Sequence, residues 1–219
     1  MGGMIQILQA SEASRSSALA WPFDVVDALL DLMDARDPTL REHSMSVAAL
    51  SVRMGVELGL PGGRVDALRC AALLHDIGKL SLPDSVLHKP GPLSPGEYEL
   101  VRYHPALGNR VAHSLGLMRE AWWILHHHER PDGRGYPDGL KEGRIPLESE
   151  IIHVADAYDA LTSDRSYRCA RTNTEALTAI VAGSGRQFNR DCVTALVTTV
   201  AREPGTDARG AAWLVGVEA

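Results

Sequence analysis

The sequence predicts an all-α protein, and three observations support this fold class. Apolar residues recur three and four positions apart along most of the 219-residue chain, and no segment keeps the alternation of apolar and polar residues that is typical of a half-buried strand. The composition, with 45% hydrophobic and 23% charged residues, is that of an ordinary globular protein rather than a disordered or fibrous one. The length suits one domain with terminal extensions better than two complete domains.

The first two predicted helices are recognised by their apolar faces. The first helix is an amphipathic segment formed by Val25, Val26, Leu29, Leu30 and Met33. This helix must end before Pro38, because a proline pushes the preceding residue out of helical geometry. In the second helix, His43 lies on the same face as several aliphatic residues. We expect that face, and the histidine with it, to point into the protein.

A third helix is predicted over residues 64–76, which are rich in alanine and leucine. Gly78 is placed to end this helix by a left-handed turn, a conformation that glycine adopts at little cost. The polar pair His75 and Asp76 therefore lies at the end of an apolar helix. We expect functional groups to gather there.

The fourth predicted helix has a clear start. Ser94, Pro95 and Glu97 fit the N-cap, the first helical position and the reciprocal cap of a helix that runs towards His104. Further helices are predicted over residues 106–115, 118–128, 149–162, 174–183 and 190–201.

A long loop is predicted over residues 129–144. This segment contains four glycines and two prolines, which are too many breakers for a helix. Long loops in compact domains are often functional, and this one directly follows three consecutive histidines. We divide the chain into an N-terminal extension (1–23), one domain (24–201) and a C-terminal tail (202–219).

Charge and composition exclude several classes of protein. The formal net charge of −6 argues against binding to nucleic-acid polymers, because such binding depends on lysines and arginines that displace counterions. No stretch is apolar enough to span a membrane, and the first residues lack the pattern of a signal peptide. The three cysteines indicate neither a disulfide framework nor a CxxC metal site. We therefore expect a cytoplasmic protein without a membrane partner.

Five histidines and two aspartates are expected to point inward and to converge. They are His43, His75, Asp76, His104, His127, His128 and Asp156. A buried carboxylate costs several kcal/mol unless something compensates it, and a metal ion does so where neutral imidazoles do not. Each histidine alone could instead be a hydrogen-bonded core residue. Together, the seven residues predict a multinuclear metal site.

Four sequence blocks resemble the HD-GYP family, a branch of the HD metal-dependent phosphohydrolases. Residues 75–79 read HDIGK, and residues 127–137 read HHERPDGRGYP. The segment that ends at Pro105 reads LPDSVLHKPGPLSPGEYELVRYHP, and residues 155–168 read ADAYDALTSDRSYR. The order and spacing of these blocks are specific to the family, and the resemblance covers about residues 24–200. It implies an HD-type helical bundle that hydrolyses the bacterial messenger cyclic di-GMP.

The resemblance also implies a set of metal ligands. The family's ligands correspond to the same seven residues, and Asp76 corresponds to the carboxylate that bridges two ions. Family members with a third metal carry a glutamate where this chain has Thr39, so we expect two divalent ions. Nitrogen and carboxylate ligands without thiolate suit iron or manganese, and zinc less well. Two such ions lower the pKa of a bridging water, which then attacks phosphorus as hydroxide.

Substrate binding requires positive charge, because a cyclic dinucleotide carries two phosphodiester groups. Lys79, one turn beyond Asp76, is predicted to act in catalysis with that aspartate and to bind phosphate. Arg165 and Arg168 are predicted by the resemblance to bind phosphate oxygens. The alternatives are a solvated surface lysine and arginines that only pair with charges at a helix end.

Three further residues are predicted to contact the substrate. Gly135 and Tyr136 would let backbone and ring approach a guanosine, and Asp37 would contact the substrate as well. Alternatively, the glycine and tyrosine only shape the loop. His153 stands three residues before Asp156, where the family pattern has a small apolar residue, and we interpret it as a neighbour of the ligands.

The predicted function is hydrolysis of cyclic di-GMP to pGpG and, by a second cleavage, to GMP. One alternative is a weakly active or inactive HD-GYP module that acts by binding a cyclic dinucleotide or a signalling protein, and Thr39 is the reason to consider it. Another is a phosphohydrolase of a different cyclic dinucleotide. A homodimer is compatible with either reading.

Overall fold

The computed structural model describes residues 23–164, 170–203 and 214–215. Within these ranges the regular elements are all helices, which confirms the predicted fold class. Two isolated β-bridges pair Asp132 with Lys141 and Ser184 with Phe188. The α-helices are α2 (Phe23–Arg36), α3 (Pro38–Glu57), α4 (Gly62–Leu74), α5 (Asp84–Leu87), α6 (Pro95–Arg102), α7 (His104–Ser114), α8 (Met118–Leu125), α9 (Leu147–Thr162), α10 (Asn173–Ala182) and α11 (Arg190–Ala201), and η1 (Ile77–Ser81) is a 3-10 helix.

Side-chain caps set several helix starts, and at α6 the cap is the one that the sequence predicted. Ser94 and Glu97 form the expected capping box at α6, with Pro95 in the first turn. At α3, the carboxylate of Asp37 accepts a hydrogen bond from the Thr39 amide at 2.9 Å. Each cap satisfies an amide that has no partner inside its helix, so the boundary is encoded locally.

The helix before the long loop ends earlier than predicted. α8 stops at Leu125 rather than at His128, and the three histidines form a turn. Nδ1 of His127 lies 2.6 Å from the carbonyl oxygen of Ile124. The ring thus bonds to one of the last carbonyls of the helix, which would otherwise have no partner inside it.

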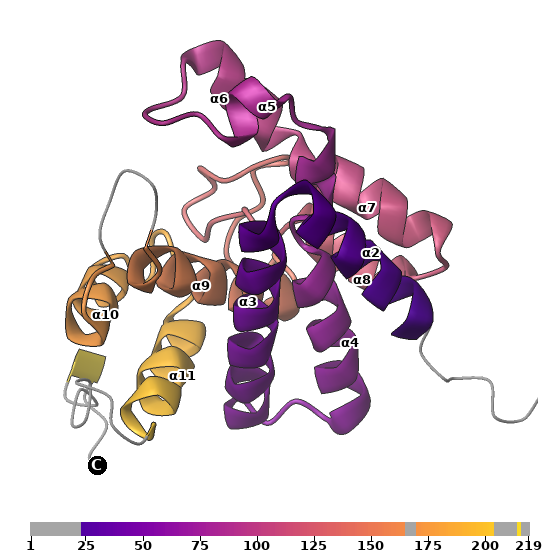
Figure 1. Ribbon diagram of the computed structural model, residues 1–219. Helices are drawn as coiled ribbons and strands as arrows, with labels where there is room; N and C mark the ends of the chain where they lie inside the picture. Colours follow the sequence, from indigo (N-terminus) through magenta and orange to yellow (C-terminus); the bar gives the residue numbers. More distant parts are fainter. Residues whose placement is uncertain (1–22, 165–169, 204–213, 216–219) are drawn as a thin grey trace, which may run out of the picture.

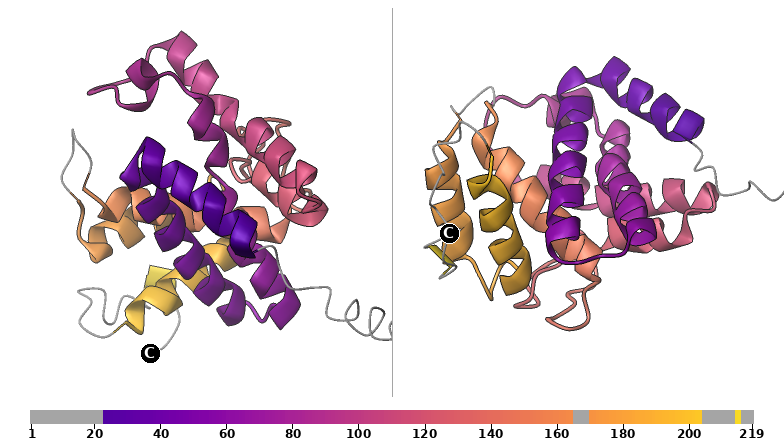
Figure 2. Two further views of the ribbon diagram at one scale, coloured as in Figure 1. Left: turned by 45° about the vertical axis from the view of Figure 1, so that its right-hand side comes forward. Right: turned by 90° about the horizontal axis from the view of Figure 1, so that it is seen from below.

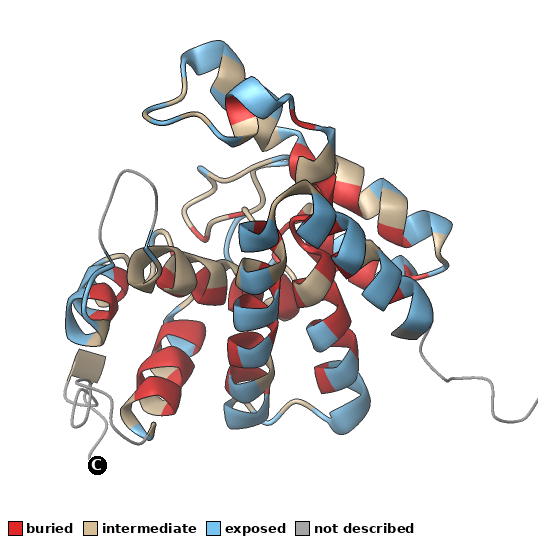
Figure 3. Cartoon of the chain, viewed as in Figure 1, coloured by how far each residue is buried: buried red, intermediate tan, exposed pale blue. Residues whose placement is uncertain are grey.

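The centre of the molecule is formed by α3, α4 and α9. α3 packs against α4 on one side and against α9 on the other, and α10 and α11 cover α9 (Figure 1). The view from below shows α3 and α4 side by side, with α2 lying across their ends (Figure 2). Buried residues face inward along these helices (Figure 3). The largest buried aliphatic side chains belong to Met33, Met54, Leu68, Leu74, Ile124, Ile151, Ile152, Leu177, Ile180 and Leu196.

Gly78 has a different role from the predicted one. It is not among the glycines with positive φ, and it lies inside η1 rather than in a left-handed turn. A Cβ at this position would overlap the backbone carbonyl of His104. Glycine is therefore required because α7 begins in contact with η1, and the prediction of a left-handed helix end was wrong.

An arm formed by α5, α6 and the loop between them projects from the bundle. It leads directly into His104, the first residue of α7. At the other end of the chain, Leu214 and Val215 are partly buried against the core, beyond the predicted end of the domain at residue 201. Among the described helices, none combines the length and the apolar character needed to cross a bilayer.

Replacement of Gly78 by alanine is expected to lower the free energy of unfolding by about 1–3 kcal/mol, because the added methyl group overlaps backbone. Equilibrium unfolding in urea measures this change. Gly63→Ala is the matched control, since nothing lies within 4 Å of a Cβ at that exposed position in α4. We expect that control to be neutral or stabilising by up to about 1 kcal/mol. Equal losses at both positions would contradict the role of Gly78.

Candidate metal centre

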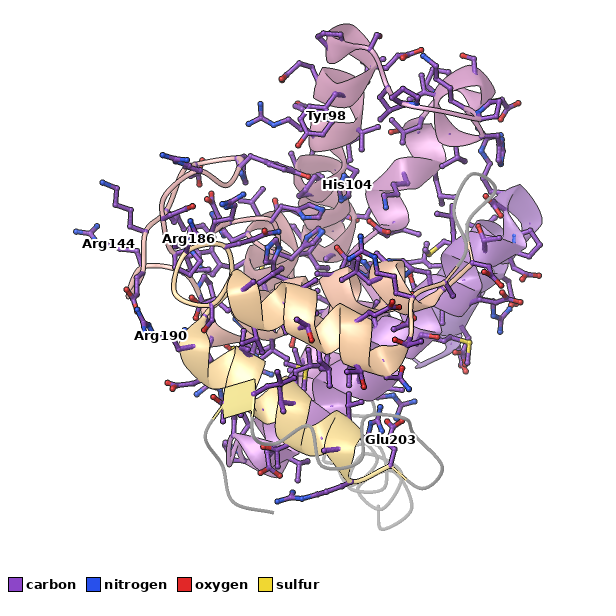
Figure 4. The ribbon with its side chains drawn as sticks, turned by 90° about the vertical axis from the view of Figure 1, so that its left-hand side faces the viewer. Tyr98, His104, Arg144, Arg186, Arg190 and Glu203 are labelled. Carbon is purple, nitrogen blue, oxygen red and sulfur yellow. The ribbon has the colours of Figure 1, made fainter. Side chains whose placement is uncertain are left out.

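The structure brings the seven predicted ligands together in the interior. Ligand atoms of His43, His75 and Asp76 lie within 4.8 Å of one another, and those of His104, His127 and His128 form a second such group. Asp156 joins the first group, with Oδ1 at 3.1 Å from Nε2 of His43. The ligands come from α3, the end of α4, α7, the turn after α8, and α9. Figure 4 shows His104 at the base of the arm, with Tyr98 farther along it.

Asp76 connects the two groups. Its Oδ2 lies 3.5 Å from Nε2 of His43 and 3.5 Å from Nε2 of His75. Its Oδ1 lies 3.2 Å from Nε2 of His104, in the second group. The carboxylate thus presents one oxygen to each group, which is the arrangement expected of a bridging ligand.

Hydrogen bonds at Nδ1 aim the imidazoles at the centre. In three of them, Nδ1 donates to a carbonyl oxygen three residues earlier in the chain. These bonds join His75 to Ala72 at 2.7 Å, His104 to Val101 at 2.6 Å and His127 to Ile124 at 2.6 Å. A neutral ring that donates through Nδ1 carries its lone pair on Nε2. Histidines that bind metals are commonly oriented in this way.

The ring of His43 is oriented by a carboxylate instead. Its Nδ1 lies 2.6 Å from Oδ2 of Asp159, while Nε2 faces Asp156 and Asp76. Burial alone would lower the pKa of His43, but the hydrogen bonds with Asp156 and Asp159 outweigh this effect and raise the pKa to about 9. The ring therefore holds a proton that a bound metal ion would have to displace.

Several lone pairs face one another at the centre of the site, and they show whether a cation fits there. Nε2 of His104 and Nε2 of His127 are 3.3 Å apart, and neither carries a proton when both rings donate through Nδ1. Nε2 of His75 and Oδ1 of Asp76 are buried without a hydrogen-bond partner among the described residues. Buried polar atoms without partners are costly, and lone pairs that face one another repel. Positive ions satisfy all of these atoms, so the residues fit a metal centre.

The protonation states also suit metal binding. Burial lowers the pKa of His75, His127 and His128, so these rings are neutral near pH 7 and available as ligands. Burial would raise the pKa of Asp76, but the charge of Lys79, together with the contacts with His75 and His104, holds this pKa well below its usual range. The carboxylate is therefore ionised.

Lys79 points into the centre rather than into solvent. Its Nζ lies 2.6 Å from Oδ2 of Asp76, and only 25% of the side chain is exposed. The 3-10 turn of η1 makes this contact possible, since it places residues three apart on one side of the helix. This geometry argues against the alternative of a solvated surface lysine.

The long loop is organised by Glu129. This carboxylate is 1% exposed and accepts hydrogen bonds from the backbone amides of Asp138, Gly139 and Leu140, at 2.7, 3.0 and 2.9 Å. At Gly135, the space for a Cβ is filled by the backbone of residues 128–130. The close approach at this glycine is thus to the loop itself, as the structural alternative proposed.

Tyr136 lies between the metal centre and the arm. Its ring centroid is 4.9 Å from that of His128, and the guanidinium carbon of Arg102, at the end of α6, is 4.8 Å from the same Tyr136 ring centroid. Burial raises the pKa of the Tyr136 hydroxyl above its ordinary value, so this group stays protonated and can donate a hydrogen bond.

Two contributors to the site were not predicted from the sequence. Asp159, which orients His43, stands three residues after Asp156, so helical spacing could have indicated it. Arg102 carries no local signal, because its contact with Tyr136 depends on how the arm folds over the loop.

Of the other residues predicted to bind substrate, the structure describes only Asp37. Asp37 caps α3, and its Oδ2 lies 3.3 Å from Nε2 of His88. Its contact with substrate stays a prediction. Arg165 and Arg168 lie outside the described residues.

Comparison with known proteins identifies relatives of this chain. Residues 27–192 match the HD domain family. A cyclic di-GMP phosphodiesterase from Thermotoga maritima is 39% identical over 178 residues, which cover 80% of this chain and 48% of that protein. The 3′3′-cGAMP-specific phosphodiesterase 1 from Vibrio cholerae is 38% identical over 150 residues, which cover 68% of this chain and 35% of that protein.

A solved structure shares the fold. The crystal structure of a cyclic GMP-AMP specific phosphodiesterase from V. cholerae superposes with a TM-score of 0.64 at 22% identity, covering 87% of this chain and 52% of that one. The chain spans about half, or less, of the length of the two curated relatives. The family match nevertheless covers most of the chain. The chain is therefore a member of the HD domain family, in agreement with the HD-GYP resemblance of its four sequence blocks.

Proposed function

We propose that this protein is a metal-dependent phosphodiesterase that hydrolyses cyclic di-GMP. The observation that carries the proposal is Asp76, whose two oxygens face two separate groups of histidine nitrogens. A carboxylate in this position suits a pair of ions, and paired ions are typical of enzymes that cleave phosphate esters. Hydrolysis adds water across one phosphodiester and breaks its P–O3′ bond, because the product pGpG keeps a 5′-phosphate. A second cleavage would give GMP.

We assign two divalent ions to the centre, iron or manganese in preference to zinc. His43, His75, Asp76 and Asp156 would hold one ion, and the second histidine group would hold the other together with Asp76. The two cysteines among the described residues are buried elsewhere in the core, so the ligands are nitrogen and oxygen only. Thr39, which replaces the glutamate of three-metal relatives, supports the number two. When bound, such ions would activate water and neutralise charge on the phosphate.

Residues around the centre have assignable roles. Lys79 reaches the bridging carboxylate and can shift towards a phosphate oxygen when the substrate enters, since a quarter of its side chain is exposed. The protonated hydroxyl of Tyr136 can donate to the substrate, and its ring face is shared between His128 and Arg102. Arg165 and Arg168 are assigned to phosphate on the basis of the HD-GYP resemblance, and Asp37 is assigned a substrate contact at the N-terminus of α3.

A different cyclic dinucleotide is the second candidate substrate. One relative of similar identity is named as specific for 3′3′-cGAMP, and no motif in the sequence reads the edges of a guanine unambiguously. Purified protein loaded anaerobically with iron or manganese should therefore be offered both dinucleotides, with chromatographic detection of products. Faster turnover of 3′3′-cGAMP would replace the proposed substrate. Binding without turnover at full metal loading would instead favour a binding module.

One prediction for this function concerns Lys79. Lys79→Gln removes a charged contact to phosphate, worth roughly 1.5–3 kcal/mol, and is expected to lower kcat/KM for cyclic di-GMP about 10-fold to 100-fold. Steady-state kinetics on metal-loaded protein measures the loss. Lys141→Gln, at an exposed position of the long loop, is the matched control and should behave as wild type. An unchanged kcat/KM in Lys79→Gln would remove this residue from the mechanism.

Another prediction concerns acidification. A proton on His43, whose pKa is raised to about 9 in the absence of metal, competes with the ion, and the other imidazoles must also be neutral to bind. Metal affinity should therefore rise with pH, and ions should be lost as the pH falls towards about 5. Elemental analysis of the protein after dialysis at about pH 5 and at about pH 9 provides the measurement. Full metal retention under acid conditions would contradict the assignment of imidazole ligands.

A further inference from the structure

The carbonyl groups of the histidine turn, residues 126–128, each have a defined partner. A helix end leaves carbonyl oxygens that need donors from elsewhere. The outer two carbonyls of the turn accept backbone amides of Glu129 and Tyr136, at 2.9 and 3.2 Å. The middle carbonyl, that of His127, lies 2.9 Å from Nδ1 of His153 on α9. A side chain from another helix thus holds the peptide group between two predicted metal ligands.

His153 is itself held in place. Its ring meets that of His128 edge-on, at 5.9 Å between centroids and 89° between planes, and lies 5.2 Å from the ring of Phe188. Because a carbonyl oxygen can only accept, Nδ1 of His153 must carry the proton of this hydrogen bond. Its Nε2 is buried and has no hydrogen-bond partner among the described residues. The bond to His127 is therefore the defined polar contact of this ring.

The hydrogen bond from His153 affects the orientation of both His127 and His128. His127 and His128 are consecutive, so rotation of the peptide plane between them changes the direction of both side chains. Each ring is further restrained by local contacts: His127 by its bond to Ile124, and His128 by its stacking with Tyr136. The peptide plane is the remaining degree of freedom, and α9 supplies the donor that fixes it.

We propose that His153 is a positioning residue for the metal centre, which directs His127 and His128 through the carbonyl oxygen between them. The proposal rests on the two-metal function proposed above. The HD-GYP resemblance led us to expect a small apolar residue at position 153. The hydrogen bond from His153 to the His127 carbonyl therefore departs from that expected pattern. Loss of a group that orients metal ligands typically weakens metal binding by roughly 10-fold to 100-fold.

The test compares two substitutions of His153 in the full chain. His153→Leu removes the donor, whereas His153→Asn places a side-chain amide nitrogen close to the position of Nδ1. Dissociation constants for manganese are measured by competition with a chelator. His153→Leu is expected to weaken binding of at least one ion by roughly 10-fold to 100-fold. His153→Asn is expected to keep most of the wild-type affinity.

Controls separate positioning from other effects. His113→Leu removes an exposed histidine from α7 and should bind metal like wild type. If His153→Leu does not fold, as judged by circular dichroism, His153→Met provides a second side chain without a donor. Wild-type affinity in the donor-free variant would overturn the proposal, and so would equal losses in the leucine and asparagine variants. A wild-type protein that binds no metal would overturn the proposed function as well, which distinguishes the two failures.

Discussion

The burial of one ionised carboxylate constrains the rest of this structure. Asp76 is 1% exposed, and its neighbours are chiefly imidazole nitrogens that carry lone pairs rather than protons. Two cationic side chains approach it, Lys79 and the protonated ring of His43, and both lie at Oδ2. An uncompensated buried charge would cost several kcal/mol. The surrounding helices are therefore arranged so that positive ions can approach both oxygens.

This arrangement explains features of the backbone that otherwise look unrelated. Gly78 lacks a side chain because the start of α7 must come close enough to place His104 beside Oδ1 of Asp76. α8 stops at Leu125, and the carbonyl oxygen of Ile124 in its last turn accepts a bond from the ring of His127, which faces the centre. Glu129 then gathers three amides of the following loop, which brings Tyr136 over His128. Each of these local irregularities helps to bring the candidate ligands together.

The sequence predicted what depends on local chemistry and on pattern. The capping box of Ser94 and Glu97 and the helical periodicity are short-range signals. The first gave the start of α6 and the second gave most of the helices, but not η1 or the short α5. The seven candidate ligands were predicted because their joint burial needed a common explanation, and the structure gathers them. Contacts between distant segments were harder to predict. The tight fit at Gly78, the orientation of His43 by Asp159 and the placement of Arg102 over Tyr136 all depend on how helices pack, so no single segment encodes them.

The bonds between imidazoles and their own chain segments have a consequence for metal selection. Three rings are anchored to carbonyl oxygens only three residues away, so their direction is set before any ion arrives. The nitrogen and oxygen ligands of this preformed site do not by themselves select one ion among those of similar radius and charge. Their affinities for such ions follow a general chemical order, so metal availability decides which ion binds. We expect the element recovered from the purified protein to report which transition metal the producing cell, or the growth medium, supplied.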